Sequence, residues 1–262
     1  VLWRTFQRGK PGVRKLYNGI EALLLRPVEI ERCRAADMVL VTSERDRVEM
    51  ARLIPRQRLA IVPNGVDTRE FAPDERATST AGRLLMTGTL NYFPNVDGAD
   101  FFARQCLPMV RETNPGVTFR IAGKDPLAQV QALGSLPGVT VVGPVPRMQD
   151  ELAQASVVLA PLRIGGGTRL KILEALAMGK AVVSTSLGAE GLEVEHGRHL
   201  LIADDPASFA RAVSDLLGDE ALRTSLGRAG RALVERRYDW EAIGETLLTA
   251  IAPLAPDEAV IA

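Results

Sequence analysis

The chain has 262 residues, of which 46% are hydrophobic and 24% charged, as in ordinary globular proteins. Its apolar runs fall well short of the roughly 18 consecutive residues that a membrane-spanning helix needs, so the sequence predicts a soluble protein. The formal net charge of +0 argues against a nucleic-acid-binding protein, although the first 35 residues carry an excess of Arg and Lys.

The two ends and the cysteines give a first expectation about origin and compartment. The chain begins at Val1, without Met and without the pattern of a signal peptide, so we expect a piece cut from a longer protein. Cys33 and Cys106 lie far apart and lack the spacing of a metal site or a disulfide framework. We therefore predict free thiols in a reducing, cytoplasmic compartment.

Short runs rich in Val, Leu and Ile alternate with helical patterns along the chain. Most of these runs are continuously apolar, as strands covered on both faces are. We predict strands at residues 38–41, 59–62, 84–86, 117–121, 139–142, 157–159, 181–184 and 200–202, with helices between them, for example at 97–112 and 148–154. The alternation predicts an α/β fold, with a Rossmann-like parallel sheet and helices on both faces.

A polar stretch at residues 72–83, which contains both Pro and Gly, is predicted to be a linker. Residues 1–71 hold only two predicted strands, too few to bury a separate core of the usual size. Residues 84–238 hold six strands and predict a complete domain. Residues 239–262 are predicted to form a last helix with an irregular tail.

The segment from Gly165 to Gly179 is the most informative part of the sequence. Three glycines at 165–167 let the backbone approach a ligand closely. Thr168 can cap the helix that follows, and the free N–H groups of that helix favour an anion. The helix is predicted to bury one apolar stripe, made of Leu170, Ile172, Leu173, Leu176 and Ala177.

Two cations, Arg169 and Lys171, stand in the first turn of this helix. Because a helix N-terminus is itself partly positive, cations are misplaced there unless an anion binds. A diphosphate would suit them, and Glu174 would suit a pair of ribose hydroxyls, which need a strong acceptor. The alternative is a plain glycine loop followed by a surface ion pair between Lys171 and Glu174.

Two stretches nearer the N-terminus add a resemblance to a known family. Residues 34–44 look like a late strand of the family's acceptor domain, and residues 61–67, Ile-Val-Pro-Asn-Gly-Val-Asp, look like the turn before its donor domain. With these, the chain resembles retaining glycosyltransferase family four, the group 1 glycosyl transferases of the two-domain GT-B fold. The resemblance implies that residues 84–238 are the nucleotide-sugar donor domain and residues 1–71 a remnant of the acceptor domain.

The chain departs from the family at the donor-sugar loop. In the family two glutamates eight positions apart bracket this loop; here the second is Glu174, while Gly166 occupies the first position. The resemblance implies that Glu174 binds the ribose. Contacts to the sugar are then expected from backbone groups at Gly165 and Gly166.

A second departure concerns the phosphate site. Many members carry an Arg and a Lys after the first strand of the donor domain, whereas residues 86–97 are similar to a branch with a Tyr-x-Pro-Asn-Val-Asp variant, with Thr89 and Pro94 where the cations would fall. Arg169 and Lys171 are expected to take over the phosphate charge. The phosphate-binding set is then Gly88, Gly167, Thr168, Arg169 and Lys171.

Two loops that end neighbouring strands are expected on the side of the sheet where open α/β folds bind ligands. The resemblance implies that they flank the nucleotide base, through Lys124 and Val145. Plain turns are the alternative for both loops. His196 and His199 complete no ligand arrangement, so no metal site is predicted.

The implied activity is that of a retaining hexosyltransferase, which moves a sugar from a UDP- or GDP-sugar to an acceptor hydroxyl in polysaccharide or glycoconjugate synthesis, without a metal or other cofactor. The expected partners are the nucleotide diphosphate sugar and a sugar or lipid-linked acceptor, with no nucleic acid. The basic N-terminal stretch suggests contact with the inner membrane face. The resemblance places the catalytic residues mainly in the missing N-terminal part, so this chain alone should bind donor without efficient turnover.

Two alternatives stay open. One is a donor-binding module that has lost catalysis, which Gly166 favours. The other is a sugar-nucleotide epimerase of similar fold.

Overall fold

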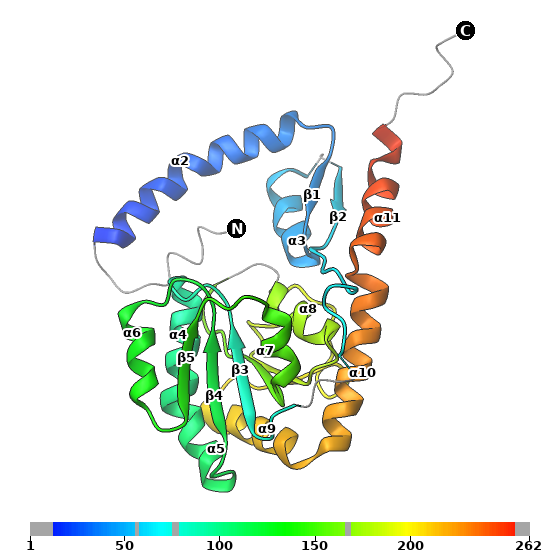
Figure 1. Ribbon diagram of the computed structural model, residues 1–262. Helices are drawn as coiled ribbons and strands as arrows, with labels where there is room; N and C mark the ends of the chain where they lie inside the picture. The colour runs from blue at the N-terminus through cyan, green and yellow to red at the C-terminus, as the bar shows by residue number, and fades with distance from the viewer. Residues whose placement is uncertain (1–12, 56–57, 75–78, 166–168, 255–262) are drawn as a thin grey trace.

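A parallel six-stranded sheet organises the molecule (Figure 1). The computed structural model describes residues 13–55, 58–74, 79–165 and 169–254. The strand order is β5-β4-β3-β6-β7-β8. The strands are β3 (Arg83–Thr87), β4 (Thr118–Ala122), β5 (Val139–Gly143), β6 (Val157–Ala160), β7 (Val182–Ser184) and β8 (Leu201–Ile202). Each coincides with a predicted strand to within one residue, so the α/β prediction is confirmed.

Helices cover both faces of this sheet because successive strand residues point to opposite sides. In β3, Leu84 and Met86 join one apolar cluster, whereas Leu85 joins the other. The first cluster is covered by α4 (Phe93–Phe101), the π-helical η1 (Phe102–Cys106), α5 (Leu107–Thr113), α6 (Ala128–Gln131), the 3₁₀ turn η2 (Ala132–Ser135) and α9 (Pro206–Gly218). The second is covered by α7 (Met148–Gln154), α8 (Leu170–Ala177) and α10 (Glu220–Arg237).

The helix predicted at residues 97–112 begins earlier than expected, at Phe93. Pro94 lies in its first turn, where a missing N–H costs no hydrogen bond, so the proline starts this helix instead of ending a loop. A π-helical turn follows α4 without a break, and its Phe102 packs edge-on against Phe119 and Phe209. One bent helical column therefore runs from residue 93 to 113.

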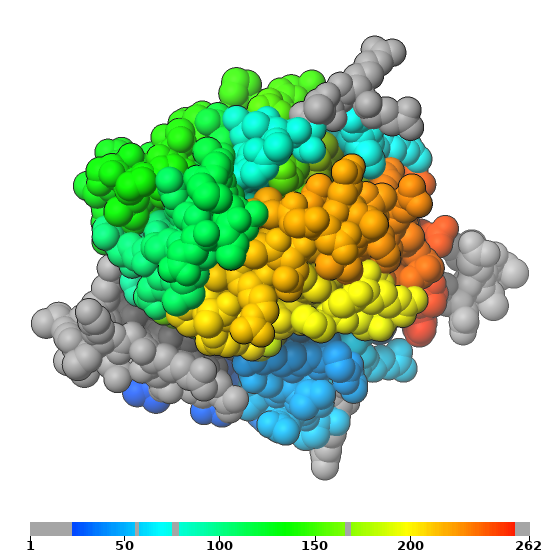
Figure 2. Space-filling model, turned by 90° about the horizontal axis from the view of Figure 1, so that it is seen from below, coloured from blue at the N-terminus to red at the C-terminus, as the bar shows by residue number. Residues whose placement is uncertain are grey.

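Helices α5, α9 and α10 also close one end of the molecule. Figure 2 shows this end, with the gold and orange residues of α9 and α10 beside the green residues of the preceding segment. Phe209 of α9 contacts Phe101 and Phe102 there, at ring-centroid distances of 6.3 and 5.8 Å. Helix α9 is therefore packed against α4 and η1.

The N-terminal part forms a small unit of its own. Two parallel strands, β1 (Val39–Val41) and β2 (Leu59–Ile61), pack with α3 (Glu44–Leu53) around Val41, Met50 and Ile54. The long helix α2 (Val13–Ala35) precedes them and lies above the sheet in Figure 1. Arg45 of α3 forms an ion pair with Glu190, in the loop after β7, and so connects this unit to the main sheet.

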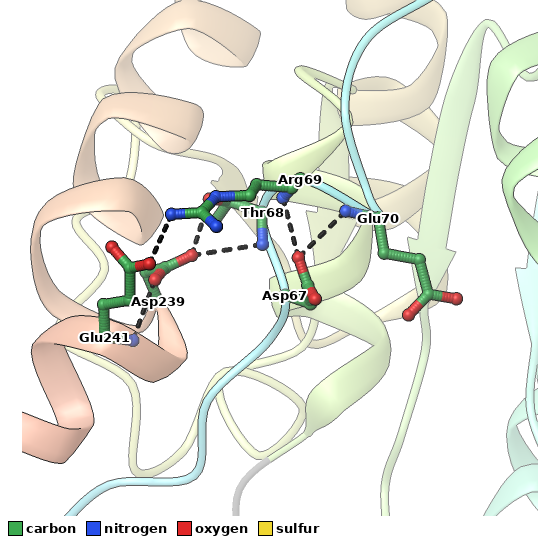
Figure 3. A network of polar contacts seen from close by, with 6 residues as sticks. All are labelled: Asp67, Thr68, Arg69, Glu70, Asp239 and Glu241. Carbon is green, nitrogen blue, oxygen red and sulfur yellow. Dashed lines mark hydrogen bonds and ion pairs between the residues drawn. The ribbon is translucent and has the colours of Figure 1, made fainter.

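A polar network ties the turn after β2 to the last helix, α11 (Trp240–Ile251), which ends in the 3₁₀ turn η3 (Ala252–Leu254) (Figure 3). Asp239 caps α11 and also accepts hydrogen bonds from the hydroxyl and the N–H of Thr68, at 2.6 and 3.2 Å. Arg69 forms an ion pair with Glu241. The chain entering the sheet and the chain leaving it are thereby held together.

The loops after β3 and β4 touch through two glycines. A Cβ atom at Gly123 would overlap the carbonyl oxygen of Gly88, and Gly123 has a φ of 155°. The N–H of Gly88 donates to Ala122 at 3.1 Å. Only glycine therefore lets these two loops approach as closely as they do.

We predict that Gly123→Ala lowers the free energy of unfolding by about 2–4 kcal/mol, because the methyl group meets backbone that cannot move aside. Urea denaturation measures this loss. Gly116→Ala is the matched control, since a Cβ atom there meets nothing within 4 Å. Equal stability of the two variants would contradict the close packing of these loops.

Candidate functional site

The strongest candidate site lies at the centre of the sheet, where the strand order reverses. β3 and β6 are neighbours there, and the chain leaves β3 toward α4 on one face and β6 toward α8 on the other. Open α/β sheets bind ligands beyond the carboxyl ends of the strands at such a point. The loop after β3 begins with Gly88, and the loop after β6 includes Gly165 and Arg169.

Lys171 reaches from the first turn of α8 to both neighbouring elements. Its ammonium group donates to the carbonyl oxygen of Thr87, at 2.6 Å, and to Oδ1 of Asn95, at 2.7 Å. The pKa of Lys171 is lowered to about 7, mainly by burial and also by the positive charge of Arg169, while Glu174 acts in the opposite direction. Both hydrogen-bond acceptors are neutral, so neither cancels the charge of the protonated ammonium group.

Arg169 is a second buried cation beside it, with only 8% of its surface exposed. Its Nε and Nη2 atoms are buried and have no hydrogen-bond partner among the residues that the structure describes. A Cβ atom at Gly165 would lie 2.7 Å from Nη2 and 3.2 Å from Cγ of Pro94, so the guanidinium group and the Pro94 ring both lie beside Gly165. An unpaired buried cation is costly, and such a group in a loop region indicates a site for an anion.

The N-terminus of α4 adds to the positive potential. Pro94 and Asn95 occupy its first turn, and Tyr92 at the cap position makes no side-chain capping hydrogen bond. The peptide dipoles leave a partial positive charge at this end. Two cations and a helix N-terminus therefore converge between the ends of β3 and β6.

Gly88 makes room for this arrangement. A Cβ atom there would lie 2.7 Å from Nδ2 of Asn95 and 2.8 Å from Nζ of Lys171, and its φ is 144°. The sequence analysis placed Gly88 among the phosphate-binding residues. Its N–H is engaged by Ala122, so its observed contribution is space for the lysine.

Glu174 lies one turn further along α8. Burial raises the pKa of its carboxyl group, Lys171 lowers it, and Glu70 raises it in turn. Glu70 belongs to the segment before the sheet and accepts a hydrogen bond from Gln149 at 2.8 Å. This segment therefore brings a second carboxylate toward Glu174, which no feature of the sequence had indicated.

The other predicted residues are placed as follows. The side chain of Lys124 is exposed, while its carbonyl accepts a hydrogen bond from the N–H of Leu90 at 2.7 Å. Val145 is part-buried against the cluster that includes α8. Gly165 is described, whereas Gly166, Gly167 and Thr168 lie outside the described residues. The structure thus brings together Gly88, Arg169 and Lys171 of the predicted phosphate set.

The predicted apolar stripe of α8 was partly wrong. Leu170 is 45% exposed, whereas Ala175 and Met178, which are not part of the predicted stripe, are buried. The helix is packed on several sides, because it contacts both the sheet and α10. A helix surrounded in this way does not follow a single stripe.

Asn95 is a site residue that the sequence analysis quoted only as part of a motif. Its role became visible through two hydrogen bonds, to Lys171 and to the carbonyl of Thr89 at 2.8 Å. The signal was its place after Tyr-x-Pro, at the start of a helix. Which residue it would meet depended on packing between α4 and α8.

Metal ligands are not gathered in the described part of the chain. No group of three or more His, Cys, Asp or Glu side chains suited to a metal ion occurs among the described residues. His196 accepts a hydrogen bond from the N–H of Ile202 and His199 one from Glu195, at 2.9 and 3.0 Å. Among the described helices none is long and apolar enough to cross a membrane.

Comparison with known sequences places this geometry in a family. The family described as glycosyl transferases group 1 matches residues 81–219, which include the whole sheet and the candidate site. An exopolysaccharide phosphotransferase of Streptomyces coelicolor is 32% identical over 217 residues, 79% of this chain and 22% of the relative. A GDP-mannose-dependent alpha-(1-6)-phosphatidylinositol monomannoside mannosyltransferase of Mycobacterium tuberculosis is 28% identical over 235 residues, 80% of this chain and 60% of the relative.

Solved structures share the fold at low sequence identity. Sucrose-phosphate synthase from Thermosynechococcus elongatus aligns with a TM-score of 0.74 and 20% identity, over 97% of this chain and 66% of that one. Anabaena Alr3699/HepE in complex with UDP and glucose aligns with a TM-score of 0.69 and 16% identity, over 86% of this chain and 66% of that one.

This chain therefore spans only part of the proteins that it matches. The family match nevertheless covers more than half of the chain, and the parallel sheet and its flanking helices agree with the GT-B glycosyltransferase structures. The protein belongs to the glycosyl transferases group 1 family.

Proposed function

We propose that the full-length protein is a retaining glycosyltransferase and that the site between β3, α4 and α8 binds the diphosphate of a nucleotide-sugar donor. The observation that carries this proposal is the pair of buried cations, Arg169 and Lys171, at the reversal point of the sheet. Neither forms an ion pair with a residue in the described ranges. A diphosphate would supply the missing negative charge and the missing hydrogen-bond acceptors.

The positions of the cations support the proposal. Many relatives carry their phosphate-binding cations where this chain has Thr89 and Pro94. Here the guanidinium of Arg169 and the ring of Pro94 both lie beside Gly165, and the ammonium of Lys171 lies at the end of β3, directly before the turn that holds Thr89. Two side chains at the N-terminal end of α8 thus place positive charge close to the loop before α4. In many relatives the phosphate-binding cations belong to that loop and to the start of that helix.

The proposed contacts to the ribose, the base and the sugar follow from positions along the carboxyl ends of the strands. Glu174 lies one helical turn beyond Lys171 and would accept hydrogen bonds from the ribose hydroxyls. Lys124 and Val145, in the loops after β4 and β5, would flank the base, as ligands do at this edge of open sheets. Gly165 and Gly166 would border the sugar, with Gly167 and Thr168 offering N–H groups to the phosphates.

In the proposed reaction the glycosidic bond to the diphosphate breaks and the sugar passes to an acceptor hydroxyl. Negative charge then develops on the departing phosphate oxygen. Fixed cations and helix N-termini stabilise such charge without reorganisation, so the proposal requires no divalent metal or other cofactor. Groups that act on the acceptor would lie in the part of the protein outside this chain.

The donor is proposed to be a UDP- or GDP-sugar. The mycobacterial relative is named for GDP-mannose, and the Anabaena neighbour was crystallised with UDP and glucose. A sugar or lipid-linked acceptor and a role in polysaccharide or glycoconjugate synthesis agree with the names of the relatives. Helix α2 exposes Leu23, Leu24 and Leu25 near basic residues, which supports a proposed peripheral contact at the inner membrane face.

A donor-binding module without catalysis is the second candidate function. Gly166 favours it, because the family's first glutamate is missing there. Both candidates share the donor site and differ only in turnover. Glycosyl transfer by the full-length protein would reject the module, whereas nucleotide binding without transfer to any acceptor would reject the enzyme.

The first test is calorimetric titration of this chain with UDP and with GDP. We expect saturable binding of one nucleotide and roughly tenfold weaker binding by Glu174→Ala, because about 1.4 kcal/mol of ribose hydrogen bonding is lost. Glu193→Ala is the control, since the Glu193 carboxylate forms an ion pair with Arg237 of α10, at 2.8 Å. Absence of binding to both nucleotides would reject the proposed donor site.

Nucleotide affinity should depend on pH through Lys171. With a pKa of about 7 in the free protein, the side chain is protonated below pH 7 and must take up a proton to bind an anion above it. The dissociation constant should therefore rise between pH 7.5 and 9, by up to about tenfold per pH unit. In Lys171→Arg the cation stays charged, so the same titration should be flat; equal slopes would contradict the role of Lys171.

Without ligand, Arg169 should destabilise the fold, because its buried Nε and Nη2 atoms have no hydrogen-bond partner among the described residues. We expect Arg169→Met to raise the free energy of unfolding by about 1–2 kcal/mol in buffer free of multivalent anions, and to abolish nucleotide binding. Arg163→Met serves as control, because Arg163 is paired with Asp97 at 2.7 Å and its loss should not stabilise. A destabilised Arg169→Met protein would show that Arg169 has a structural partner instead.

A further inference from the structure

Asn95 connects the two sides of the candidate site. Its side chain is 6% exposed, at the start of α4. The amide Nδ2 donates to the carbonyl of Thr89 at 2.8 Å, and Oδ1 accepts from the ammonium of Lys171 at 2.7 Å. One planar group therefore links the turn after β3 to the first turn of α8.

These contacts hold the ammonium group in one place. A lysine side chain has four rotatable bonds, and ordering it for a ligand costs conformational entropy. Here the ammonium is already oriented by the carbonyl of Thr87 and by Asn95, and the missing side chain of Gly88 leaves space for it. An ammonium has three donors, so one stays available for a phosphate oxygen.

The chemistry of an amide suits this position better than that of a carboxylate or an apolar group. Asn donates to one neighbour and accepts from the other, which neither Asp nor Leu does. Being neutral, it also leaves the positive charge of Lys171 uncancelled. The charged groups that act on this ammonium are Arg169, which opposes its charge, and Glu174, which favours it, both from the same helical segment; β3 and α4 present the neutral groups of Thr87 and Asn95.

We propose that Asn95 is a positioning residue of the donor-phosphate site, which holds the Lys171 ammonium and the turn at residues 88–89 in the arrangement that receives the diphosphate. This inference rests on the proposed function and adds a residue that acts through Lys171 instead of touching the donor. It also accounts for an asparagine buried at the start of a helix.

The direct test follows the titration of Lys171. The sequence holds five lysines, Lys10, Lys15, Lys124, Lys171 and Lys180, so the 13Cε signal of Lys171 can be assigned with Lys171→Arg. We expect a midpoint near pH 7 in the wild type, a lower midpoint in Asn95→Leu, which loses a hydrogen-bond acceptor, and a higher one in Asn95→Asp, which gains a negative charge. An unchanged midpoint in Asn95→Leu would overturn the proposal.

The second test measures UDP or GDP affinity by calorimetry, with the nucleotide that the wild type binds. Asn95→Leu should weaken binding about tenfold at pH 8 and much less at about pH 5.5, where Lys171 is protonated even without Asn95. Asn95→Asp should weaken binding at both values, because its carboxylate repels the diphosphate. A loss of the same factor at every pH would indicate a purely structural role and reject the positioning role.

Asn114→Leu is the matched control. It makes the same change of residue type at the other end of the helical column, where Asn114 donates to Val110 at 3.3 Å. It should alter stability without moving the Lys171 midpoint or the pH dependence of binding. If the Lys171 midpoint shifts in Asn95→Leu while the wild type binds neither nucleotide, the donor site itself is rejected and Asn95 is only a structural partner of Lys171.

Discussion

The side chain of Lys171 joins the three elements around the candidate site. It extends from α8, and its ammonium group donates hydrogen bonds to the carbonyl of Thr87 in β3 and to Asn95 at the start of α4. For this to happen the chain needs glycine at position 88, where a side chain would occupy the place of the ammonium. Gly123 must in turn lack a side chain, because it packs on the backbone of Gly88. The loops after β3 and β4 therefore make room for one buried ammonium group. Burial disfavours the charge of this group and so lowers its pKa.

A second buried cation, Arg169, turns this packing arrangement into a candidate site, because its Nε and Nη2 atoms have no hydrogen-bond partner among the described residues. Natural folds satisfy nearly all buried polar groups, and the exceptions concentrate where a ligand completes the set. Arg169 and Lys171 would repel each other in a dry core, yet both lie at the N-terminus of α4, which is itself positive. A bound anion would offset the positive charge of Arg169, of Lys171 and of the helix N-terminus together.

The segment before the sheet belongs to this site more closely than its composition suggests. Its Glu70 acts on the carboxyl group of Glu174, and Arg231 of α10 donates to the carbonyls of both Phe71 and Ala177, at the end of α8. Asp239 binds Thr68 from the start of α11 (Figure 3). These contacts connect the segment after β2 with α8, and Arg45 joins the N-terminal unit to the loop at Glu190.

Local patterns determined the strands, the α/β class and the segment that holds Arg169, Lys171 and Glu174, because burial on both faces and glycine-rich turns leave a signal in neighbouring residues. Tertiary structure alone decided which groups meet. Asn95 lies 76 positions before Lys171, and their contact depends on the packing of α4 and α8 at opposite sides of two adjacent strands. The start of α4 was mispredicted because Pro94 lies inside the first turn of the helix. The burial around α8 was mispredicted because a helix packed on several sides has no single apolar stripe, so only the assembled sheet shows what its side chains face.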